Sequence, residues 1–266
     1  MINLTLYKRE MKNSIKILVI FVAVISMYIA IIIGMYDPEM MASLDQFYDM
    51  MPELMSAVGM TTGATSLLGF MISYLYGFIL LVFPMIFAII RGNSLVAKYV
   101  EKGSMVALLA SPVKRSTVAL TQLSVLLSGI VLLIAYATGL ELAVAHAKFP
   151  GELAISELFK LNSALLCLHL FIGSICYLAT CFFSDTKYSI TVGAGIPALM
   201  YVLQMLANSG EKAEFINKMT FFTLFDPNGI VAGDSNATLG AIVLVVGAVL
   251  LYTLGVLVFC RKDLHI

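Results

Sequence analysis

The residues that could do chemistry in this sequence are few and widely spaced. The three histidines stand at positions 146, 169 and 265, and the four cysteines, at 167, 176, 181 and 260, form no C-x-x-C pair. The sequence has no H-E-x-x-H zinc pair, no G-x-S-x-G nucleophile turn and no G-x-x-x-x-G-K-[ST] loop of the kind that holds ATP phosphates. We therefore expect that the chain is not an enzyme, holds no metal and binds no cofactor itself.

A few isolated residues leave alternatives open. His169 lies inside an apolar stretch, where it is either a proton relay or a neutral side chain that hydrogen-bonds to another helix, and we favour the second role. Met51 and Met55 are one helical turn apart in the methionine-rich segment 37–62, and thioethers are Cu(I) ligands. No nearby His or Cys completes such a site, so we favour packing instead. We expect Glu141, at the end of an apolar stretch, to lie at the membrane surface.

These residues are set in six long apolar stretches. Hydrophobic residues make up 61% of the 266 residues and charged residues only 12%, whereas a soluble domain has about 25% charged residues. Each stretch has about 20 residues or more, the length of an α-helix that crosses a hydrocarbon core of about 30 Å. The sequence thus predicts an all-α integral membrane protein, one transmembrane domain over 1–266. The six predicted spans are 15–36, 64–90, 117–140, 162–183, 188–207 and 238–260.

The basic residues between the stretches predict an orientation. If both termini are cytoplasmic, only Lys148, Lys160, Lys212 and Lys218, of the 16 Lys and Arg residues, fall on the outer side. Membrane proteins carry an excess of Lys and Arg in their cytoplasmic loops. We therefore expect both termini and the loop 91–116 in the cytoplasm, and the segments 37–62 and 208–237 outside.

Three shorter segments also have recognisable patterns. Residues 3–16 are basic with interspersed apolar residues, which predicts an interfacial helix before the first span. The loop 91–116 contains an apolar helical run that Pro112 ends. The aromatic segment 208–237, interrupted by Asp226-Pro227, predicts short outer helices before the sixth span.

One part of that loop resembles a known family. Residues 99–115, YVEKGSMVALLASPVKR, resemble the first cytoplasmic loop of ABC transporter permeases of the ABC-2 type. The ends of the chain, LYKRE at 6–10 and FCRKDL at 259–264, are similar to the ends of that family. The resemblance implies the membrane subunit of a bacterial exporter in the plasma membrane. Two permease chains, identical or related, would pair, and each would dock on a cytoplasmic ATPase subunit that binds ATP and Mg.

The resemblance also implies residue roles. A coupling helix at about 101–111 would sit in a groove of the ATPase, with Leu108 and Leu109 buried there. The implied coupling residues are Glu101, Lys102, Gly103, Ser104, Met105, Val106, Leu108, Leu109, Lys114 and Arg115. The second and fifth spans would line the pathway between protomers, with Ser73, Tyr74, Tyr76, Gly193, Gly195 and Pro197. Apolar and aromatic pathway residues favour an amphipathic or lipophilic cargo: a peptide, toxin, drug or lipid.

Two other classes remain as alternatives. A secondary transporter or channel-like protein, not coupled to ATP, requires several ionisable residues deep in the spans, and we expect only His169 there. An intramembrane enzyme or assembly scaffold requires a catalytic pair or metal cluster within the spans, and the sequence shows neither.

Overall fold

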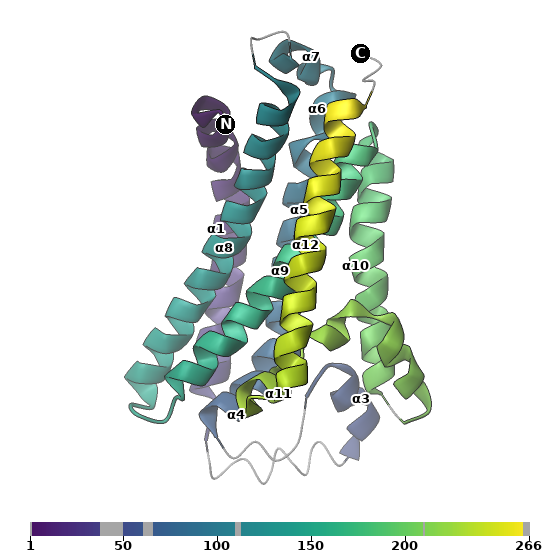
Figure 1. Cartoon of the computed structure of the whole chain (residues 1–266). Coiled ribbons are helices and arrows are strands. Elements are labelled where there is room, and N and C mark those ends of the chain that lie inside the picture. The colour runs from purple at the N-terminus through teal and green to yellow at the C-terminus, as the bar shows by residue number, and fades with distance from the viewer. Residues whose placement is uncertain (1, 38–49, 61–65, 110–112, 210, 263–266) are drawn as a thin grey trace.

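The computed structural model describes residues 2–37, 50–60, 66–109, 113–209 and 211–262. Within these residues, six helical segments are long and apolar enough to cross a membrane, and they lie side by side (Figure 1). The chain is therefore a multi-pass, all-helical membrane protein, as predicted. The spans are α1 (Leu4–Gly34), the continuous run Leu67–Glu101, α8 (Arg115–Lys148), α9 (Ile155–Phe182), α10 (Thr186–Asn208) and α12 (Ser235–Arg261).

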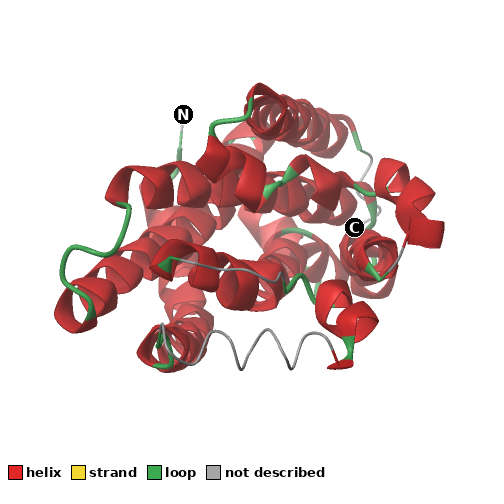
Figure 2. Cartoon of the chain, turned by 90° about the horizontal axis from the view of Figure 1, so that it is seen from below, coloured by secondary structure: helices red, strands yellow, loops and turns green. Residues whose placement is uncertain are grey.

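The fourth span, α9, is central to the packing. It packs against α8, α10, α12 and the second span, and 61% of its most apolar window is buried. The corresponding share is only 22% in α1 and in α10, which therefore lie at the periphery of the bundle. The end-on view in Figure 2 shows the helices grouped around the interior of the bundle.

The two ends of the bundle carry different short helices. Both chain termini lie at one end, together with α6 (Ala97–Glu101) and α7 (Ser104–Leu109), while α3 (Pro52–Ala57), α4 (Leu67–Met71) and α11 (Pro227–Ala232) lie at the other (Figure 1). Two 3-10 helices, η2 (Glu211–Met219) and η3 (Phe221–Leu224), and α11 precede the sixth span. The short helices predicted there are thus confirmed; the membrane side that each end faces stays a prediction.

The start of the chain differs from the prediction. Residues 3–16 do not form a separate interfacial helix, because α1 runs without a break from Leu4 to Gly34. Asn3 caps it by accepting a hydrogen bond from the backbone N–H of Leu6. The buried residues Leu6, Glu10 and Ser14 follow one another at a spacing of four, so they form one helical face packed against the bundle.

The second span is the least regular. It consists of α4, the π-helix η1 (Ile72–Ile79), α5 (Leu80–Leu95) with Pro84 inside it, and α6. A π-helical segment and a proline both disturb the regular backbone hydrogen bonds of an α-helix. Inside a membrane the backbone groups that they leave unpaired need partners from neighbouring helices.

Candidate functional site

His169 supplies a hydrogen-bond partner for one unpaired backbone group of the second span. Pro84 has no backbone N–H, so the carbonyl oxygen of Leu80 lacks its usual donor one turn along α5. The Nε2 atom of His169, on α9, lies 2.8 Å from this oxygen, and His169 is fully buried. Accordingly, His169 hydrogen-bonds to another helix, the role that we favoured from the sequence.

Cys176 supplies a hydrogen-bond donor for an unpaired carbonyl group of the fifth span. Pro197 deprives the carbonyl oxygen of Gly193 of its usual donor. The Sγ atom of Cys176, two turns along α9 from His169, donates to that oxygen over 3.2 Å. In both spans that contain a proline, a side chain of α9 therefore replaces the missing backbone hydrogen bond.

Thr180 joins α9 to the break between α5 and α6. The backbone at Val96 departs from helical geometry, with φ −125° and ψ −61°, so the helix is interrupted there. The hydroxyl of Thr180 accepts a hydrogen bond from the N–H of Ala97 at 2.8 Å and donates to the carbonyl of Asn93 at 3.4 Å. One buried hydroxyl thus bridges the two helices across the break.

Glu141 requires a correction. It is not exposed, as a residue at the membrane surface would be: it is fully buried, because α8 continues to Lys148 and carries this side chain against neighbouring helices. Its Oε2 atom accepts hydrogen bonds from the Tyr76 hydroxyl at 3.0 Å and from Asn162 Nδ2 at 2.8 Å. Its Oε1 atom has no hydrogen-bond partner among the described residues. A buried carboxyl group therefore joins three spans.

A second buried polar cluster lies at the end with the termini. Arg91 and Glu10 are almost completely buried, and Arg91 Nη2 lies 3.4 Å from Glu10 Oε2. The hydroxyl of Tyr99, in α6, donates to the other carboxylate oxygen of Glu10. This cluster fixes the start of α1 to both α5 and α6.

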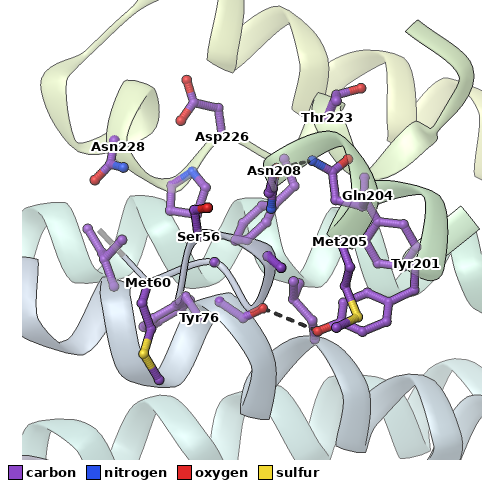
Figure 3. Close-up of a pocket in the computed structure, with 18 of the residues that line it drawn as sticks. Ser56, Met60, Tyr76, Tyr201, Gln204, Met205, Asn208, Thr223, Asp226 and Asn228 are labelled. Carbon is purple, nitrogen blue, oxygen red and sulfur yellow. Dashed lines mark hydrogen bonds between the residues drawn. The ribbon is translucent and has the colours of Figure 1, made fainter. Parts of the chain in front are cut away.

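The opposite end contains a cavity of about 530 Å³. Its lining includes the amide side chains of Gln204 and Asn208 and the aromatic rings of Tyr76 and Tyr201 (Figure 3). Gln204 Nε2 donates to Asn208 Oδ1 at 2.9 Å, and Tyr201 donates to the carbonyl of Gly77 at 3.5 Å (Figure 3). The lining is therefore both polar and apolar, as an amphipathic ligand would require.

Two glycines that line this cavity, Gly59 and Gly77, lie close together. Gly59 has φ +80°, and a Cβ atom added to it would lie 2.7 Å from the Cα atom of Gly77. Residues other than glycine rarely adopt this backbone conformation, and a Cβ atom at position 59 would clash with the backbone of Gly77. The segment after α3 can therefore lie directly against the π-helix of the second span.

The six predicted pathway residues do not lie on one surface. Ser73, Tyr76, Gly193 and Pro197 are buried between helices of this chain, and Tyr74 is half-buried. Tyr76 also lines the cavity of about 530 Å³. Gly195 is exposed, and no heavy atom of the described residues lies within 4 Å of a Cβ built on it. Only Gly195 is thus available at the surface of the chain, and the pathway role of all six stays a prediction.

The predicted coupling residues lie at the end with the termini. The structure places Glu101 at the end of α6 and Ser104 to Leu109 in α7; residues 110 and 111 of the predicted coupling helix lie outside the described residues. Four coupling residues in a row are exposed, and they are followed by a buried Met105 and a half-buried Leu108. The exposed ones are Glu101, Lys102, Gly103 and Ser104.

The remaining two coupling residues border the same end. Lys114 and Arg115 are exposed, and Arg115 Nη1 donates to the carbonyl of Lys262 at 2.8 Å. Lys262 in turn donates to the carbonyl of Phe182 at 2.6 Å, and burial lowers the pKa of its ammonium group. The start of α8 is thereby joined to the ends of α9 and α12.

Sequence reasoning missed most of the polar residues that join helices. Arg91 and Glu10 carried the signal of opposite charges beside apolar stretches, but Asn162 and Thr180 had no distinguishing pattern.

Comparison of the chain with protein-family models, with curated proteins and with solved structures finds no match.

Proposed function

We propose that this chain is the membrane-spanning permease subunit of an ATP-driven exporter of the ABC-2 type. In this proposal two copies, or two related chains, form the pathway for an amphipathic or lipophilic cargo. Separate cytoplasmic ATPase subunits bind ATP and Mg. The end with both termini faces the cytoplasm of a bacterial cell, and the chain lies in the plasma membrane.

The observation that carries the proposal is the way α6 is attached. Tyr99 of α6 donates to Glu10 of α1, and the N–H of Ala97 donates to Thr180 of α9. A carboxylate oxygen of Glu101 accepts from the N–H of Thr186, at the start of α10, at 3.3 Å. A force applied to the exposed residues after α6 would therefore act on three spans at once, which is what coupling to ATP hydrolysis requires.

The outer surface of α10 supports pairing with a second chain. Leu199, Val202 and Leu206 are exposed and lie on the same side of α10 as Gly195. Small residues at a helix surface allow two helices to approach closely in a membrane. We place the contact with the second copy on this face.

The proposal is tested by isolating the chain from its own cells in a mild detergent and measuring ATP hydrolysis in the complex. Lys102→Glu reverses a charge at the exposed docking residues, and Lys218→Glu makes the same change at the opposite end, where the side chain is also exposed. We expect the first change to remove the associated ATPase and the second to leave it. An equal effect of both changes, or isolation of the chain with no ATPase activity, contradicts the proposal.

Glu141 favours a second candidate, a proton-coupled secondary transporter. Ionisable residues in the spans are the usual components of proton pathways, and Glu141 is buried beside Tyr76, which lines the cavity. In this alternative Glu141→Gln abolishes transport driven by a pH gradient in vesicles without ATP. The exporter proposal instead requires ATP for transport by the unchanged chain.

A further inference from the structure

A second cavity, of about 990 Å³, lies at the end of the bundle with the termini. Residues of α1, α10 and the α5–α6 segment line it, together with Ser104 of α7. We propose that this cavity binds an anionic phospholipid, with the phosphate at the end of the bundle and the acyl chains toward its middle. The proposal needs only the membrane-spanning architecture and not an ATPase.

Charge is the first argument. Arg9, Arg91, Lys98 and Lys102 line the cavity, against only two carboxylates, Glu10 and Glu101. Glu10 is paired with Arg91, and Glu101 accepts a backbone hydrogen bond from Thr186. Arg9, Lys98 and Lys102 form no ion pair within the part of the chain that the structure describes. The cavity thus has an excess of positive charge that a phosphate group would neutralise.

An unpaired buried donor is the second argument. Arg91 is only 4% exposed, yet its Nε atom has no hydrogen-bond partner among the described residues. Its other donors go to Ser94 at 3.0 Å and to Glu10 at 3.4 Å. A buried N–H without an acceptor is costly, and a guanidinium is well suited to phosphate oxygens. Arg91 lines the cavity, so a phosphate bound there would offer further acceptors beside this guanidinium.

The order of residues along the helices is the third argument. On α1 the lining changes from Arg9 and Asn13 to Ile17, moving from the end of the bundle toward its middle. The second span and α10 show the same change. On the second span, Lys98 and Ser94 lie nearer the end of the bundle, and Ile90 and Ile89 lie nearer its middle. On α10, Thr186 lies nearer the end and Ile190 nearer the middle.

A polar headgroup region above an apolar wall matches a lipid, whereas a free phosphate ion would leave the wall unused. Ile90 and Ile190 are 43% and 44% exposed, so these apolar side chains are available for contact with acyl chains. Basic pockets between spans on the cytoplasmic side are known positions for acidic lipid headgroups. The combination selects a glycerophospholipid with net negative charge.

Native mass spectrometry of the purified chain alone tests the proposal. The chain is exchanged into mixtures of phosphatidylglycerol and phosphatidylcholine, and the lipid retained per chain is counted. We expect one retained phosphatidylglycerol, and roughly tenfold weaker retention in the double variant Arg9→Gln/Lys98→Gln, since each basic residue contributes to lipid binding near the surface. The control Lys114→Gln/Arg261→Gln removes the same charge from exposed positions at the same end, outside the cavity, and should retain the lipid.

Two further arms separate the lipid from other ligands. Ile190→Asn should weaken retention by placing an amide among the acyl chains, and millimolar inorganic phosphate should not displace the lipid. Displacement by inorganic phosphate together with no effect of Ile190→Asn assigns the site to a free anion and overturns the lipid proposal. Equal losses in the two double variants, or no preference for phosphatidylglycerol, also overturn it. No ATPase is present, so the outcome is independent of the proposed function.

Discussion

The carbonyl oxygen of Leu80 and the Nε2 atom of His169 lie 2.8 Å apart, at the point where Pro84 removes the usual backbone donor. Cys176 and Gly193 repeat this relationship at Pro197. In both places a span keeps its proline because α9 supplies the missing donor. The central helix therefore contributes to the shape of the second and fifth spans, the two spans that we predict to line the pathway.

The first prediction separates this role of His169 from simple packing. His169→Leu removes the donor and should lower the free energy of unfolding by about 1 kcal/mol, the scale of interhelical hydrogen bonds in membranes. Pro84→Ala restores a backbone N–H for Leu80, so the same His169→Leu change should cost less in that background. Melting temperatures of the unchanged chain, the two single variants and the double variant, purified in one detergent, provide the measurement. An identical loss in both backgrounds would show that the hydrogen bond has no energetic role.

The second prediction concerns the buried pair of Arg91 and Glu10. Replacing one partner of a buried ion pair leaves an uncompensated charge and typically costs about 3–5 kcal/mol. Glu10→Leu and Arg91→Met should each sharply reduce the yield of folded protein, whereas the double variant should be more stable than either single one. Yield after size-exclusion chromatography tests this. A double variant no better than the worse single variant argues against the pairing.

The third prediction compares two glycines of the same helix. A Cβ on Gly193 would lie 3.3 Å from that of Ala179 and 3.4 Å from the Cα atom of Cys176, so Gly193→Leu should reduce folding. Gly195 is exposed, so Gly195→Leu should leave the yield normal. If this face meets a second copy along the pathway, Gly195→Leu lowers transport per assembled complex. Normal transport by this variant would remove α10 from the pathway.

The fourth prediction concerns orientation. In a chain with Cys176→Ser, which keeps a donor for Gly193, and the other cysteines replaced by Ala, single cysteines are placed at Ser104 and Ser235. Both positions are exposed, and they lie at opposite ends of the bundle. An impermeant maleimide applied to intact cells should label position 235 and not position 104. The reverse pattern would invert the predicted topology.

The sequence predicted the spans because long apolar runs have few alternatives in a membrane, and all six appear in the structure. Their ends were less predictable. Helix α1 begins at Leu4 and α8 extends to Lys148, beyond the apolar stretches 15–36 and 117–140, because helices continue through polar residues wherever one face remains packed. Apolar runs mark only the part of a helix that must be apolar all round.

The polar contacts between helices could not be predicted. Glu141 is buried because Tyr76 and Asn162, 65 and 21 residues away in the chain, provide its hydrogen bonds. The sequence contains these residues but not their proximity. Pro84 and Pro197 stand in the sequence, but the α9 side chains that bond to the carbonyl groups left unpaired there became apparent only from the packing.

The central claim, that an ATPase docks on the exposed residues after α6, is tested most directly by a photo-crosslink from position 104. A photoreactive phenylalanine analogue replaces Ser104 in the full chain, expressed in its own cells, and the crosslinked protein is identified by mass spectrometry. The account predicts a protein whose sequence contains a G-x-x-x-x-G-K-[ST] loop, and predicts that Lys102→Glu abolishes the crosslink while Lys218→Glu does not. Crosslinks that reach only lipid, or only proteins without such a loop, would contradict it.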